Sequence, residues 1–152
     1  MLMKRVNKEK DMVKSRLVVL EKMFYTQTDE EHQMINTEIL EYLKEHDVPA
    51  NEKTLRGDIR LLQPLGVGIV KVVSRHNRYY LGKREFNLLE LKVLIDAVSS
   101  SRFITTKKSH DLGRKLADLA SDNQKKNLRR NAYATSRIKN SNESIYGMPK
   151  CS

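Results

Sequence analysis

The stretch that decides the fold is Asn51-Glu52-Lys53-Thr54-Leu55-Arg56-Gly57-Asp58-Ile59-Arg60-Leu61-Leu62. Its apolar residues Leu55, Ile59 and Leu62 recur at the i, i+4, i+7 spacing of a helix that buries one face. Its basic residues lie largely outside that face. Asn51 directly precedes the helix, at the N-cap position, where asparagine is a preferred residue. The stretch therefore predicts an amphipathic helix over residues 52–63 with a basic solvent face.

The flanking residues predict a helix before this segment and a β-hairpin after it. Apolar side chains at helical spacing indicate a helix over residues 35–43, and only residues 46–50 link it to the basic helix. Further on, β-branched residues over 67–73 predict a strand, and residues 79–81 predict the return strand. Helix, short turn, basic helix and hairpin is the order of a winged helix-turn-helix, which lays its second helix in the DNA major groove.

The sign of the charge changes at the start of the basic helix. From Thr28 to Glu52 the chain carries eight acidic residues and one basic residue. From Lys53 to Arg84 it carries eight basic residues and one acidic residue, Asp58. Such a run can be the solvated face of an ordinary helix. We favour nucleic acid as the partner because the hairpin is basic as well and is not helical.

The bulk properties restrict the class of protein only broadly. A chain of 152 residues with net charge +10 fits one domain, or a small domain with an appendage, that has an acidic partner. Ribosomal, nucleic-acid and membrane-surface proteins share this balance. No apolar run reaches the length of a membrane span, and no secretion signal follows Met1. With Cys151 as its single cysteine, we expect a reducing, cytoplasmic location. If DNA is the partner, we expect the chain at the nucleoid.

We expect a mainly α fold with a small β-hairpin, namely three helices and a two-stranded wing followed by two or three helices. The expected segments are a polar, frayed arm over 1–12, a winged helix-turn-helix over 13–82, a helical connector over 83–133 and a disordered tail over 134–152. The first helix is expected over residues 13–25. Asn87 and Glu90 resemble a capping box that opens the connector.

The sequence gives no support to catalysis. Its four histidines share no metal-ligand spacing, and no serine or cysteine stands in a nucleophile motif. We therefore expect no enzyme activity, no catalytic residue, no metal site and no cofactor.

Several phrases of the chain resemble bacterial transcriptional regulators that carry a WYL domain. The DeoR-like helix-turn-helix of that family is resembled by Lys53-Thr54-Leu55 and Asp58-Ile59. The helical connector that follows it is resembled by Tyr79–Phe86, Glu90-Leu91-Lys92, Ile95–Val98 and Ser100–Phe103. The junction with the WYL domain is resembled by Ser141–Tyr146. The resemblance implies a homodimeric regulator. In that family the WYL domain is an Sm-like β-barrel thought to sense a ligand.

Three features depart from the family pattern. The chain ends at Ser152, so the WYL domain is missing and no small-molecule effector is expected. Gly57 stands where relatives usually carry arginine, and Pro64 replaces a helix-compatible residue. Gly57 and Pro64 lower the expected affinity for DNA. The alternative function is that of a truncated paralogue whose connector pairs with a full-length regulator in a heterodimer.

Seven residues are candidate contacts to double-stranded DNA: Arg16, Lys53, Thr54, Arg56, Arg60, Arg75 and Arg78. Arg56 and Arg60 are expected to read base edges, since arginine binds guanine bidentately. Thr54 is expected to meet a phosphate through its hydroxyl and its backbone amide, and Arg16 to meet one from the first helix. The hairpin arginines are expected to contact the DNA backbone.

Overall fold

The computed structural model describes the backbone of residues 2–129 and the side chains of residues 11–129. The chain forms two compact units, Met1–Glu85 and Phe86–Ser152. This boundary lies close to the predicted end of the first domain at residue 82. The described part is mainly helical with one small antiparallel sheet, which confirms the predicted class of secondary structure. The predicted tail over 134–152 lies outside the described residues.

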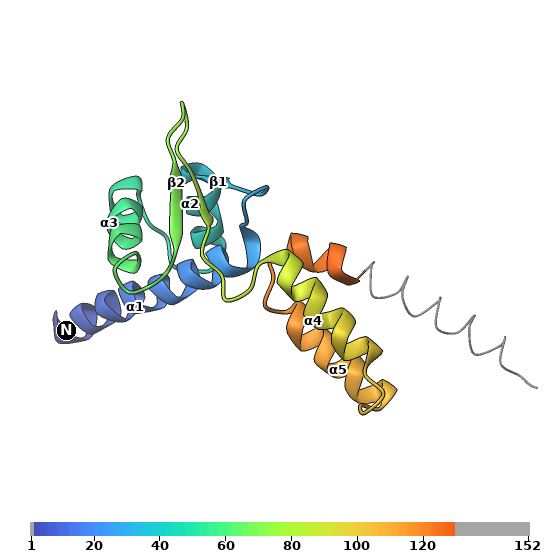
Figure 1. Ribbon diagram of the computed structural model, residues 1–152. Helices are drawn as coiled ribbons and strands as arrows, with labels where there is room; N and C mark the ends of the chain where they lie inside the picture. The colour runs from blue at the N-terminus through green and yellow to red at the C-terminus, as the bar shows by residue number, and fades with distance from the viewer. Residues whose placement is uncertain (1, 130–152) are drawn as a thin grey trace, which may run out of the picture. The chain divides into compact units, whose positions relative to one another are not determined.

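The first unit contains three helices and three strands in the order shown in Figure 1. They are α1 (Leu2–Gln27), β1 (Met34–Ile35), α2 (Asn36–Glu45), α3 (Glu52–Leu62), β2 (Ile69–Val72) and β3 (Arg78–Leu81). The predicted basic helix and hairpin are confirmed to within a few residues. In Figure 1 the turn between β2 and β3 extends beyond the helices of this unit.

Helix α1 is longer than predicted. It begins at Leu2, so the backbone of the expected arm over 1–12 is helical from its second residue. Residues 2–12 include several lysines and a glutamate and contain no glycine or proline. Such residues have good helix propensity, so a helix started by the apolar residues beyond Val13 continues through them. The expectation of a frayed arm is therefore wrong.

The sheet has three strands where a two-stranded wing was predicted. Its order is β1-β3-β2 and both pairs are antiparallel. Met34 pairs with Tyr79 on one side of β3, and Lys71 pairs with Tyr79 on the other. Strand β1 is only two residues long. A segment that short has no alternating pattern, and the sequence consequently shows no sign of it.

Both ends of the connection between α2 and α3 are closed by hydrogen bonds. Asp47 has a positive φ of 58°, and its amide donates to the Lys44 carbonyl while the Val48 amide donates to the Leu43 carbonyl at 3.0 Å. This is the Schellman pattern, which satisfies carbonyls at a helix C-terminus. At the start of α3, the Thr54 amide donates to Asn51 Oδ1 at 2.8 Å. The predicted N-cap is confirmed.

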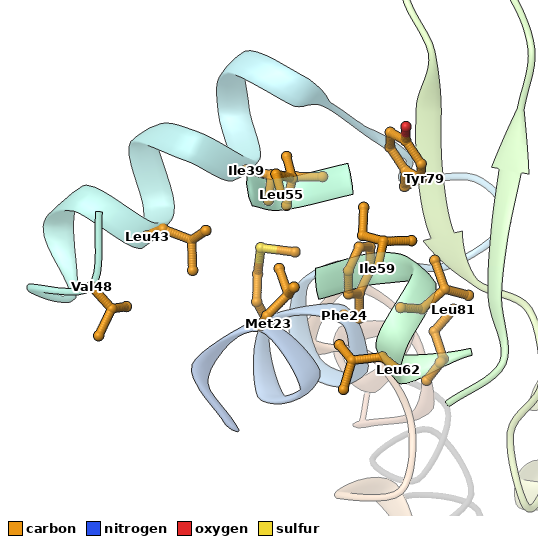
Figure 2. Close-up of a cluster of buried hydrophobic side chains, with 12 residues drawn as sticks. Met23, Phe24, Ile39, Leu43, Val48, Leu55, Ile59, Leu62, Tyr79 and Leu81 are labelled. Carbon is orange, nitrogen blue, oxygen red and sulfur yellow. The ribbon is translucent and has the colours of Figure 1, made fainter. Parts of the chain in front are cut away.

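One apolar core holds the first unit together (Figure 2). Leu55, Ile59 and Leu62 of α3 are all buried, as their spacing predicted. They pack with buried side chains from α1, α2, the connection after α2 and the hairpin: Leu20, Met23, Phe24, Ile39, Leu43, Val48, Ile69, Tyr79 and Leu81. Because α3 gives its apolar face to this core, its opposite face is left to solvent.

The second unit is built from α4 (Leu88–Ser100), α5 (Thr106–Ala117) and a helical segment over residues 122–129. The predicted capping box is confirmed, since Glu90 N donates to Asn87 Oδ1 and Asn87 N donates to Glu90 Oε2, each at 2.9 Å. A small core is formed by Leu91, Ile95, Ala117, Ala120 and Leu128. Among the described helices, none combines the length and apolar character that a membrane span requires.

Candidate nucleic-acid interface

The single acidic residue in the middle of α3 faces inward and is paired with α1. Arg16 Nε donates to Asp58 Oδ2 at 2.6 Å, and Arg16 Nη2 donates to Asp58 Oδ1 at 3.3 Å. The exposed fractions of the two side chains are only 8% and 9%. The predicted phosphate contact by Arg16 is therefore wrong: its guanidinium is buried and committed to Asp58. The pattern of apolar residues on α1 did not show that Arg16 lies at the edge of its packed face.

The outward face of α3 is cationic. Lys53, Arg56 and Arg60 are exposed, and so is Gly57 between them. A Cβ atom at Gly57 would have no atom within 4 Å. With Asp58 turned inward, the middle of this face carries no negative charge. It has the composition of a surface that binds phosphates or base edges.

Two of the predicted α3 contacts are partly engaged within the helix. The Thr54 amide is taken by the Asn51 cap, so only the Thr54 hydroxyl remains for a phosphate. This corrects the expectation that the amide would bind as well. Arg56 Nη2 lies 3.3 Å from Glu52 Oε2 in an ion pair whose side chains are more than half exposed. Exposed pairs of this kind are weak, and a phosphate can therefore replace the carboxylate.

The hairpin divides its basic side chains between two faces of the sheet. Lys71 is directly opposite Tyr79, and paired residues of neighbouring strands share a face. Tyr79 packs into the core with α3, which places Lys71 on the face toward α3. Lys71 was not among the predicted contacts. Its position could have been predicted from its i+2 spacing to the apolar Ile69, because alternate residues of a strand share a face.

Arg78 lies on the opposite face of the sheet. It pairs with Val72 and Ile35, one position before Tyr79. It lines a surface depression with the acidic side chains of Glu30, Glu31 and Glu38. The sequence predicted that Arg78 contacts the DNA backbone from the hairpin, and its position beside these carboxylates disfavours that contact. Arg75 in the turn between β2 and β3 is exposed and stays a candidate.

Tyr79 ties the hairpin to the charged part of α3. Burial raises the pKa of its phenol, the nearby Arg56 lowers that pKa and Glu52 raises it. The ring lies in the core with Leu55 and Ile59 (Figure 2). At the other end of α3, Gln63 Nε2 donates to the Ile69 carbonyl at 3.1 Å. Hairpin and helix thus have contacts at both ends of α3, which fix the hairpin cations relative to it.

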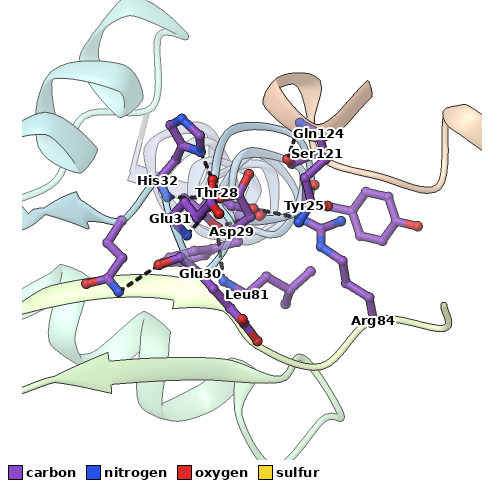
Figure 3. A network of polar contacts seen from close by, with 12 residues as sticks. Tyr25, Thr28, Asp29, Glu30, Glu31, His32, Leu81, Arg84, Ser121 and Gln124 are labelled. Carbon is purple, nitrogen blue, oxygen red and sulfur yellow. Dashed lines mark hydrogen bonds and ion pairs between the residues drawn. The ribbon is translucent and has the colours of Figure 1, made fainter. Parts of the chain in front are cut away.

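A polar network fixes the return strand to the end of α1 (Figure 3). Thr28 Oγ1 donates to the Phe24 carbonyl at 2.7 Å and accepts from the Leu81 amide at 3.0 Å. Arg84 Nη2 donates to the carbonyls of Tyr25 and Thr28 at 2.8 and 2.7 Å. The last carbonyls of a helix lack partners within the helix, and a cation there also complements the helix dipole.

Arg84 is therefore a structural residue and not part of the cationic surface. Its guanidinium also lies 5.0 Å from the centre of the Tyr25 ring. Burial lowers the pKa of Arg84, while Tyr25 and Asp29 raise it. Arginine remains charged in proteins, so this charge serves to hold the end of α1.

The structure brings together Lys53, the Thr54 hydroxyl, Arg56 and Arg60 on α3, and it places Lys71 on the sheet face toward them. We call these five residues the α3 surface. Within residues 11–129, no group of three or more His, Cys, Asp or Glu side chains is placed to hold a metal ion. Comparison with protein-family models, with curated proteins and with solved structures found no match to the chain.

Proposed function

We propose that the chain is a sequence-specific DNA-binding transcriptional regulator. In this proposal the first unit is a winged helix-turn-helix, α3 enters the major groove, and β2 and β3 form the wing. The resemblance of the sequence to the DNA-binding part of WYL-domain regulators agrees with it. A cytoplasmic, nucleoid-associated location and a homodimeric state belong to the same proposal.

The observation that carries the proposal is the division of α3 into two faces. Its apolar residues are buried in the core, Asp58 is neutralised by Arg16, and the remaining face presents exposed cations. A helix held in this way is rigid and positive where it meets its partner. The major groove admits an α-helix, and arginine there discriminates guanine by about 1–3 kcal/mol for each good bidentate pair.

The roles of the cations follow from where they lie. Arg56 and Arg60 are one turn apart on the exposed side of α3, so they are assigned to base edges. Lys53 and the Thr54 hydroxyl, at the start of the helix, are assigned to phosphates. Lys71 and Arg75 of the hairpin are assigned to the DNA backbone, which positions the protein without reading the sequence.

The proposal can be tested by selecting duplexes from a random library and measuring binding of the selected and random duplexes by fluorescence anisotropy. Arg60→Ala should lower affinity for the selected duplex more than for random DNA. Arg75→Ala should lower both by the same factor, since a backbone contact carries no sequence information. Arg78→Ala is the matched control and should change neither, because Arg78 lies on the other sheet face.

Two results would count against the proposal. One is that the wild-type chain selects no sequence from the library. The other is that Arg60→Ala and Arg78→Ala have equal effects on the selected duplex. In either case the cationic face of α3 would be only a solvated helix surface.

A second candidate function is supported by α4. Leu91 and Ile95 of this helix are buried in the small core, but Leu89 and Val93 are 74% and 66% exposed. Such a helix is apolar on two faces, and the described residues of its unit cover only one of them. This favours an interaction protein that pairs with a full-length relative through its connector. Co-purification with such a relative, lost in Leu89→Ser/Val93→Ser and kept in Arg60→Ala, would support it.

A further inference from the structure

A basic depression in the second unit is not used by the proposed function. Side chains from α5 and from the helical segment over 122–129 line it, and its basic lining residues are Lys108, Arg114, Lys115, Lys125 and Arg129. Lys125 and Arg129 belong to a short basic segment of the sequence that begins at Lys125. The fold adds the lysines of α5 to it.

The two carboxylates in the depression are already neutralised. Asp111 Oδ1 accepts from Arg114 Nη2 at 2.7 Å, and Asp118 forms an ion pair with Lys125. Among the described residues, Lys108, Lys115 and Arg129 have no carboxylate partner. The depression therefore carries an excess of three positive charges that no carboxylate within residues 11–129 offsets.

The spacing of these cations favours an extended anion. Positions 108 and 115 lie on the same side of α5, about 10 Å apart along the helix axis. A single phosphate ion carries at most about two negative charges, so it cannot balance both lysines and Arg129. A chain with phosphates at regular intervals can contact both of them and Arg129 as well. Electrostatic binding of such a chain needs no base contact and releases counterions.

We propose that this depression binds the phosphate backbone of nucleic acid, as a second site separate from the α3 surface. The choice of nucleic acid as the polyanion rests on the proposed function. The site itself rests on the three unpaired cations. It increases affinity for every DNA sequence and adds to the salt dependence of binding, but it does not add to sequence preference.

The test is the salt dependence of duplex DNA binding by the full chain. The triple variant Lys108→Gln/Lys115→Gln/Arg129→Gln should lower the slope of log affinity against log salt by about 2–3, since each neutralised phosphate contributes about 0.9. Selected and random duplexes should lose affinity by the same factor. Lys108→Arg/Lys115→Arg keeps both charges and should leave the slope unchanged.

The matched control removes three exposed cations elsewhere, as Lys22→Gln/Lys44→Gln/Lys92→Gln. It makes the same change in net charge. An equal fall in slope for the control and the depression variant would overturn the proposal, because only the overall charge would matter. Amide shifts in α5 on adding inorganic phosphate, with no change in the DNA slope, would also overturn it.

The two proposals fail in different ways. If Arg60→Ala abolishes sequence preference but the depression variant leaves the salt slope unchanged, the α3 assignment stands and this inference is wrong. If the depression variant lowers the slope but Arg60→Ala does not alter sequence preference, the inference stands and the chain is a nonspecific nucleic-acid binder.

Discussion

Arg16 of α1 and Asp58 of α3 form a buried ion pair, with 2.6 Å between Nε and Oδ2. The pair lies where α1 packs against α3, so it sets the orientation of the helix that carries the α3 surface. Breaking one member of a buried pair leaves an uncompensated charge and costs about 3–5 kcal/mol. Replacing both members by apolar residues avoids that cost.

We therefore predict that Asp58→Ala destabilises the chain by about 3–5 kcal/mol and that Arg16→Met/Asp58→Leu recovers most of the loss. Urea unfolding followed by circular dichroism measures both. The double variant should bind DNA like the wild type, because Arg16 makes no DNA contact in our assignment. If the double variant folds but binds DNA much more weakly, Arg16 does contact DNA and our assignment is wrong.

Gly57→Arg should increase both stability and DNA affinity. Glycine costs about 1 kcal/mol relative to alanine within a helix, and a Cβ atom at this position would meet no atom within 4 Å. The added cation should steepen the salt slope by about 0.9 for one more phosphate. Thermal unfolding and anisotropy titrations measure the two effects.

Gly113 of α5 provides the control for that variant, since a Cβ atom there also meets no atom within 4 Å. Gly113→Ala should stabilise the chain without altering its affinity for DNA. If Gly57→Arg raises the melting temperature and leaves DNA binding unchanged, α3 does not face DNA, and the interaction-protein function gains support.

Asp47→Gly should stabilise the connection between α2 and α3. Asp47 has a φ of 58°, a region that costs an ordinary residue about 1–2 kcal/mol and glycine very little. Glycine also loses more conformational freedom on folding, so we expect a net gain of up to about 1 kcal/mol. Asp47→Val should instead destabilise, and a melting temperature that ranks valine above glycine would contradict the Schellman assignment.

Tyr79 should make stability fall in alkaline solution. Because burial raises its pKa, the folded chain binds the phenolic proton more tightly than the unfolded chain does. This stabilisation is complete below the unfolded pKa of about 10 and is lost as the pH rises through the higher folded value. Unfolding at several pH values from 9 to 11 should show a steeper fall for wild type than for Tyr79→Phe. Equal pH dependence would show that the Tyr79 phenol ionises freely in the folded chain.

The strongest sequence patterns located the elements, but they did not show where each charged side chain points. The spacing of Leu55, Ile59 and Leu62 predicted which face of α3 is buried, because one helix period decides it. Asn51 and Asn87 marked helix starts through local hydrogen bonds. Arg16 was misplaced because its partner Asp58 is 42 positions away in the sequence. The sheet face of Arg78 follows only from the strand register, which the sequence does not give.

Tertiary contacts decided the role of Arg84 as well. Its partners are carbonyls at the end of α1, 56 and 59 positions earlier in the chain. Every residue has a backbone carbonyl, so the sequence cannot indicate which of them accept a hydrogen bond. For Lys71, in contrast, the sequence carries part of the information. Its position on the sheet face follows from strand alternation, but only after the register with Tyr79 is known.

The sheet order has a further consequence for solubility. Strand β2 lies at an edge of the sheet and pairs only with β3 among the described strands. It belongs to the β-branched run from Ile69 to Val73, in which Lys71 is the single charge. A lysine on an edge strand blocks pairing with the same edge of another molecule, and one charge within such a window suppresses aggregation. Lys71 is therefore expected to oppose edge-to-edge pairing of two molecules. Because Lys71→Gln removes this charge, a test of its proposed DNA contact should include a measurement of self-association.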